Sequence, residues 1–232
     1  MRRLLFHSTM LVVFSVAAKR EFAGAFWVGY GIRRLMRENS QIGNFSDSYS
    51  RYNASLQELL YGQKEFADQI GSMEVKGVAI LFACTHSSSG GSRVSKIKIS
   101  NLSLAVDLGE RPLLWLGNAG QEESVTHLEE RFTHVPTTKL KEAVPFAISI
   151  HDSSRQASAF LRRQLKESEE ERIRGGCAAW IGLRGQAEDL KLLVEAATTD
   201  ISRHVREQPV FGVSQMPFEE ATDALMEMVR GR

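Results

Sequence analysis

The chain has 232 residues, of which 43% are hydrophobic and 25% are charged, an ordinary composition for a globular protein. Lysine and arginine number 29 against 28 acidic residues, so the net charge is +1; we expect no nucleic-acid partner. The six histidines show no metal-ligand spacing, and no apolar run reaches the roughly 18 residues of a membrane-spanning helix. Cys84 and Cys177 lie in apolar runs, which indicates buried thiols and a reducing compartment.

The first twenty residues allow three interpretations. Met10–Phe14 is a short apolar run between polar or small residues, typical of a buried strand. Arg2 and Arg3 before an apolar stretch also resemble a secretory signal, and the scarcity of acidic residues before Arg37 is typical of a mitochondrial presequence. We favour the strand and expect an intracellular location, with the mitochondrion as the alternative. Val229–Arg232 contains no prenylation cysteine, so we expect no lipid anchor.

Two helices are expected before residue 72. Residues 22–36 predict a mostly buried helix ending in a basic cluster, which suits the negative end of the helix dipole. Residues 38–71 carry apolar side chains at alternating three- and four-residue steps, which predicts a second helix with one apolar seam. That helix either packs on its own domain or offers a protein-binding surface. The seam residues assigned to a partner are Tyr49, Tyr52, Leu56, Leu59 and Phe66.

Strands are expected from residue 75 onward. Val75–Cys84 is an apolar run typical of a strand, followed by a serine- and glycine-rich loop. Residues 93–108 alternate between apolar and polar residues with a phase shift at Asn101, which predicts a bulged strand. A turn at residues 109–110 then lets residues 111–116 return as the other strand of a hairpin.

The second half of the sequence predicts alternating helices and strands. Apolar stripes indicate helices at 122–132, 151–165, 188–205 and 218–229, with Asp152 or a neighbouring serine as a helix N-cap. Short apolar runs indicate strands at 144–150, 177–182 and 209–213. The charge run at 166–174 is interpreted as a solvated helix end and loop.

Residues 113–122 read Leu-Leu-Trp-Leu-Gly-Asn-Ala-Gly-Gln-Glu. This stretch resembles the third strand and second switch of small GTPases of the Ras/Rab kind, and the order of the later elements is similar. The resemblance implies an α/β, Ras-like P-loop fold: a central, mostly parallel sheet flanked by helices, with a helical insertion. Residues 1–37 would form the first strand, a degenerate phosphate loop and a helix, residues 38–92 the insertion and a loop, and residues 93–232 the remainder of the domain.

The resemblance also implies roles for single residues. Gln121 would position the attacking water if the protein is active. The other candidates for nucleotide binding are Lys19, Arg20, Gly120, Arg184 and Ser214. Three of the four nucleotide-contacting motifs depart from the family pattern: the first loop lacks glycine, Gly117 replaces the magnesium-orienting aspartate, and Leu183 replaces the guanine-side asparagine.

Three functions are compatible with this pattern. The leading hypothesis is a pseudo-GTPase that acts as a scaffolding subunit of a protein complex, without cofactor or metal. The alternative is an active, divergent GTPase that binds GTP or GDP with magnesium. Residues 77–83 and Lys96 also resemble a proteasome-type β-subunit, but Asp68 stands where its threonine nucleophile would lie.

Overall fold

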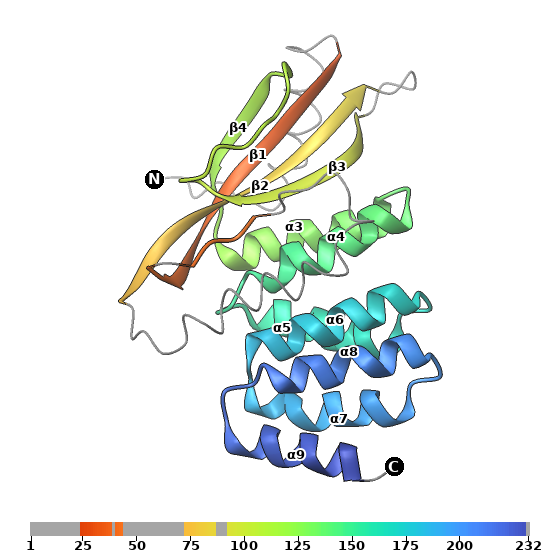
Figure 1. Ribbon diagram of the computed structural model, residues 1–232. Coiled ribbons are helices and arrows are strands. Elements are labelled where there is room, and N and C mark those ends of the chain that lie inside the picture. The colour runs from red at the N-terminus through yellow and green to blue at the C-terminus, as the bar shows by residue number, and fades with distance from the viewer. Residues whose placement is uncertain (1–23, 39, 44–71, 87–91, 231–232) are drawn as a thin grey trace, which may run out of the picture. The chain divides into compact units, whose positions relative to one another are not determined.

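The computed structural model describes residues 24–38, 40–43, 72–86 and 92–230 (Figure 1). The chain separates into two compact units, residues 1–120 and residues 121–232. The first unit contains a β-sheet, and the second is built from helices. The expected strand Met10–Phe14 and most of the insertion, residues 44–71, lie outside the described residues.

The sheet of the first unit is mixed. It consists of β1 (Ala25–Arg37), β2 (Met73–His86), β3 (Ser92–Asn101) and β4 (Leu113–Asn118), in the order β3-β2-β1-β4. β1 pairs antiparallel with β2, and β2 pairs antiparallel with β3, so only β1 and β4 are parallel. The predicted Ras-like fold with a mostly parallel sheet is therefore wrong. Such a sheet needs a crossover between successive strands, whereas β1, β2 and β3 are consecutive antiparallel neighbours.

β1 occupies the residues for which the sequence predicts a helix. Phe26, Val28 and Tyr30 are fully buried on one face of the strand, while Trp27 is buried on the other. The Trp27 indole donates a hydrogen bond to the carbonyl of Leu108 over 2.8 Å. A strand buried on both faces produces a continuous apolar run, which periodicity cannot distinguish from a buried helix.

The other strands confirm some expectations and correct others. The strand predicted at residues 75–84 is confirmed by β2, and the strand at 111–116 by β4. β3 ends at Asn101, and its register shift lies at Ser95 rather than at Asn101, because Ala83 pairs with Lys96 and Cys84 pairs with Val94. The expected hairpin between residues 93–108 and 111–116 is wrong, because β3 and β4 lie at opposite edges of the sheet.

Gly117 has a backbone conformation that few other residues adopt. Its φ angle is +91°, in the region that costs L-residues with a side chain about 1–2 kcal/mol. The pairing of β4 with β1 shifts register at this point, between Gly29 and Gly31. A glycine is therefore required at position 117 by the backbone of β4, which accounts for its presence where the resemblance leads one to expect aspartate.

The second unit is a stack of helical hairpins. The helices are α3 (Gln121–His134), α4 (Thr138–Ser149), α5 (Arg155–Glu167), α6 (Glu171–Arg184), α7 (Leu190–Thr199), α8 (Arg203–Ser214) and α9 (Glu219–Arg230), with a 3₁₀ turn η2 (Ala187–Asp189). Successive helices pair as α3–α4, α5–α6 and α7–α8, and α6 also packs against α4 and α8. Figure 1 shows the pairs lying one below another, with α9 at the end. This is the arrangement of α-solenoids.

Three helices of this unit agree with the sequence. The helices predicted at 122–132, 151–165 and 218–229 correspond to α3, α5 and α9. Ser154 is the N-cap of α5, and its hydroxyl accepts a hydrogen bond from the amide of Ala157 over 3.1 Å. Phe160 and Leu161 on the predicted face are buried. Local capping and a one-sided apolar stripe were enough to identify these segments.

The three strands predicted in this half are wrong. Residues 144–150, 177–182 and 209–213 belong mainly to α4, α6 and α8. These helices are packed on several sides by their neighbours, so their apolar residues form runs rather than stripes. Pro145 and Pro209 lie inside α4 and α8 and are buried. Proline in a helix interior is unfavourable, so tertiary packing outweighs local preference here.

The helix predicted at 188–205 is two helices. α7 ends at Thr199, and α8 begins at Arg203 with Ser202 as its N-cap. Between them Ile201, which was expected to face inward, is 94% exposed. The apolar residues on each side continue a helical period, but the chain reverses at Asp200, and periodicity alone does not locate the turn.

Candidate functional site

The residues assigned to a nucleotide site are only partly brought together. Gln121 is the first residue of α3, directly after Gly120, and Arg184 is the last residue of α6. Ser214 is the exposed last residue of α8. The remaining assigned residues lie outside the described part of the chain: Lys19, Arg20, Tyr49, Tyr52, Leu56, Leu59 and Phe66.

Arg184 closes the C-terminal end of α4. Its guanidinium donates hydrogen bonds to the carbonyls of Ser149 and His151, at 3.1 and 2.8 Å, and of Asp152 at 3.2 Å. The last carbonyls of a helix have no partner within the helix, and a cation is favoured there by the helix dipole. The hydrogen bonds thus give Arg184 a structural role.

Gln121 holds the same loop from the other side. The hydroxyl of Ser153 donates to its side-chain oxygen over 2.7 Å, and the amide of Ser153 donates to the same atom over 3.2 Å. Gln121 and Arg184, which the sequence places in one nucleotide site, therefore do converge on the loop between α4 and α5. Both side chains form hydrogen bonds with groups of the loop itself, and in this way they stabilise the turn.

A serine–histidine pair lies beneath this loop. The Nε2 atom of His151 is 2.8 Å from the hydroxyl of Ser124, and its Nδ1 atom is 3.1 Å from the carbonyl of Ile148. A catalytic pair of this kind needs a substrate at the hydroxyl, and its histidine is usually oriented by a third group such as a carboxylate. Ser124 and His151 are completely buried, so the contact joins α3 to the loop and offers no surface to a substrate.

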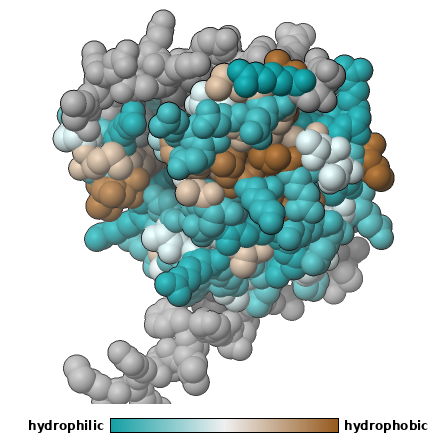
Figure 2. Space-filling model, turned by 90° about the horizontal axis from the view of Figure 1, so that it is seen from below, coloured by the Kyte–Doolittle hydropathy of each residue, from teal (hydrophilic) through white to brown (hydrophobic). Residues whose placement is uncertain are grey.

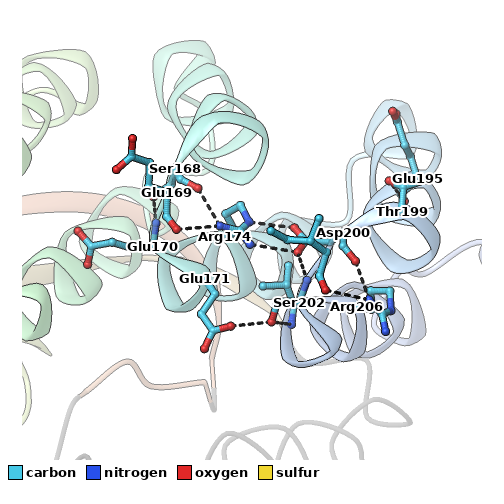
Figure 3. A network of polar contacts seen from close by, with 12 residues as sticks. Ser168, Glu169, Glu170, Glu171, Arg174, Glu195, Thr199, Asp200, Ser202 and Arg206 are labelled. Atoms are coloured by element: carbon cyan, nitrogen blue, oxygen red, sulfur yellow. Dashed lines mark hydrogen bonds and ion pairs between the residues drawn. The ribbon is translucent and has the colours of Figure 1, made fainter.

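A second polar network joins the hairpins at the opposite ends of the helices (Figure 3). Arg174 of α6 makes two hydrogen bonds to the carboxylate of Asp200, at 2.9 and 3.1 Å, and one to the carbonyl of Ser168 at 2.9 Å. These hydrogen bonds lower the pKa of Asp200. Arg206 donates to the carbonyl of Asp200 over 2.7 Å. We call this group the Arg174–Asp200 latch, because it fixes the α5–α6 turn to the α7–α8 turn.

The sequence pattern does not predict the latch. The charge run at residues 166–174 predicts a solvated helix end and loop. Arg174 is only 8% exposed. A signal was present: Arg174 precedes Cys177 and Ala178 by three and four residues, which puts all three on one helix face. A basic residue on a buried face predicts a carboxylate partner, although only the structure identifies that partner as Asp200.

The described residues contain no group of three or more histidine, cysteine or acidic side chains suited to a metal ion. Burial raises the pKa of the Cys177 thiol, which disfavours the reactive thiolate. No helix in the described ranges is both long enough and apolar enough to cross a bilayer.

The last helix exposes apolar side chains. Ala221 of α9 is buried and Leu225 and Met228 are half-buried, whereas Met226 and Val229 are 44% and 72% exposed. Val229 was expected on the buried face and is not there. Met226 and Val229 are three residues apart and so adjoin on the helix; we call them the α9 strip. Figure 2, seen from below Figure 1, shows hydrophobic clusters among mostly hydrophilic side chains.

Acidic residues flank the α9 strip. Around the helix, Met226 and Val229 stand between the buried face and a polar face that carries Glu219, Asp223 and Arg230. A helix with 3.6 residues per turn places these residues on neighbouring stripes. The arrangement presents an exposed apolar edge beside carboxylates.

Comparison of the chain with protein-family models, with curated proteins and with solved structures finds no match.

Proposed function

We propose that the protein is a scaffolding subunit that binds a protein partner through its helical unit. The proposal is supported by the stacking of α3 to α9, since α-solenoids commonly serve as extended binding surfaces. Polar groups at the turns, among them Arg184, Arg174 and Asp200, are engaged in contacts between helices, which favours a rigid support. The pseudo-GTPase part of the sequence interpretation is not carried forward, because the sheet is not Ras-like.

The α9 strip is the observation that carries this proposal. When a partner covers Met226 and Val229, each Å² of apolar surface removed from water favours binding by about 0.025 kcal/mol. Methionine is also frequent on surfaces that accept protein partners. The adjoining carboxylates favour a partner with basic residues at the rim.

The test compares the full-length protein with two variants in a pull-down from the source cells, followed by mass spectrometry. The double variant Met226→Lys/Val229→Lys alters the strip. Ile201→Lys is the control, at an exposed residue in the turn between α7 and α8. Substitutions at exposed sites usually change stability by less than about 0.5 kcal/mol, which thermal melts verify.

The expected result is a set of proteins recovered with the wild type and with Ile201→Lys but lost with the double variant. Recovery of the same proteins by a folded double variant contradicts a partner site on α9.

A further inference from the structure

One end of the β-sheet exposes four large apolar side chains. Leu35 of β1, Met73 and Val75 of β2, and Leu102 just after β3 are each between 51% and 64% exposed. We call these four residues the sheet-end patch. Isolated exposed apolar residues are normal, whereas a contiguous group indicates a binding surface.

Strand register places the members of the patch on the same face. Leu35 is directly opposite Val75, and Arg37 is opposite Met73, and directly opposed residues of an antiparallel pair point to the same side. Leu102 lies over Gly77: its Cδ1 atom is 2.7 Å from the position of a Cβ added to that glycine. Because Gly77 is two residues after Val75, all four side chains are neighbours.

The two faces of this sheet end differ in their charged residues. Arg33 and Arg37 are exposed and alternate with Leu35 on the patch face of β1. Glu74 and Lys76 alternate with the patch residues of β2, so they point to the opposite face, where they form an ion pair of 2.9 Å. The patch face therefore combines apolar side chains with two exposed arginine side chains.

We propose that the sheet-end patch binds the surface of an anionic lipid bilayer. The four exposed apolar side chains are free to insert between lipid headgroups. Arginines beside inserted apolar groups reach the lipid phosphates. The charge complementarity between the protein and the lipid is confined to the patch, because the net charge of the whole chain is only +1.

The α9 strip provides a matched control for this proposal. Met226 and Val229 are also exposed apolar residues, but their helix carries Glu219, Glu220, Asp223 and Glu227 against the one basic residue Arg230, and an anionic surface repels this net negative charge. The proposal is independent of the function assigned to α9, so either one can fail without the other.

The test is co-sedimentation of the full-length protein with vesicles of phosphatidylcholine, with and without about 30% phosphatidylserine, which supplies the negative surface potential. Three double variants are compared with the wild type: Leu35→Ser/Val75→Ser, Arg33→Gln/Arg37→Gln and Met226→Ser/Val229→Ser. Thermal melts establish that each is folded. If the apolar variant does not fold, the arginine variant and a salt titration decide.

The wild type and the α9 variant are expected to bind phosphatidylserine vesicles, with binding that weakens as salt is added. The arginine variant should bind about five-fold more weakly for each arginine removed, and the apolar variant about ten-fold or more. The proposal is overturned if the wild type ignores these vesicles or if the patch variants bind as tightly as the wild type. Binding of an acidic amphipathic peptide in place of vesicles also overturns it and assigns the patch to a protein partner.

Discussion

Buried His127 makes the stability of the protein sensitive to acid. Burial, with a smaller contribution from the charge of Arg131, lowers the pKa of His127 from 6.5 to about 4. The folded protein therefore binds a proton at this imidazole less readily than the unfolded chain does. The contribution of neutral His127 to the free energy of unfolding is complete above about pH 6.5 and decreases as the pH falls toward 4. Its full size is about 3 kcal/mol.

The variant His127→Gln tests this effect, since glutamine does not titrate. Chemical unfolding of both proteins is measured between pH 7.5 and about 4.5. The wild type should lose roughly 2–3 kcal/mol more than the variant over this interval. A difference in unfolding free energy that stays constant with pH contradicts the neutral, buried state of His127.

Gly117 is predicted to resist substitution because of its backbone alone. A Cβ at this position meets no atom within 4 Å, yet φ is +91°. Gly117→Asp should therefore cost about 1–2 kcal/mol through strain, and it should create no nucleotide site. Gly120→Asp is the matched control, because it has equal space and no positive φ. Equal melting temperatures for the two variants would show that the strain is absent.

At the scale of elements, α6 and α8 cross at a contact that admits no side chain. A Cβ added to Gly182 lies 2.2 Å from the Cα atom of Gly212, so the two helices must separate to accept it. Gly182→Ala should destabilise the protein by about 3 kcal/mol or more. Urea unfolding measures the loss.

Gly176→Ala is the control for this contact. It lies on the same helix, and its added Cβ meets only the Nε1 atom of Trp180, at 3.9 Å. Alanine is a better helix former by up to about 1 kcal/mol, so this variant should be as stable as the wild type or more stable. If both alanine variants behave alike, the close crossing of α6 and α8 is not needed for stability.

At the scale of the whole molecule, the division at residue 120 predicts that the helices fold by themselves. Residues 121–232 form one compact unit with three hairpins and α9, and about three repeats are enough for a stable helical array. When expressed alone, this segment should show a helical circular-dichroism spectrum and a cooperative thermal transition. A segment that melts without cooperativity shows that residues 1–120 are required.

The candidate surfaces differ in how far the sequence could locate them. The sequence indicates an apolar stripe in α9 but assigns Val229 to its buried side. It indicates a helix where Leu35 lies, so the sheet-end patch could not be found before β1 and β2 were paired. The Arg174–Asp200 latch joins residues 26 positions apart, and no local pattern specifies such a pairing.

The sequence by itself determined the elements that are apolar on one side or bounded by local signals: β2, β4, α3, α5 and α9. It did not determine β1, α4, α6 or α8, because residues buried on several sides lose the periodicity that distinguishes a helix from a strand. Sheet order was decided by the tertiary structure alone, since pairing β1 with both β2 and β4 depends on contacts between residues far apart in the chain. The resemblance at residues 113–122 captured a strand followed by a helix, a local arrangement that folds other than the Ras-like one also contain.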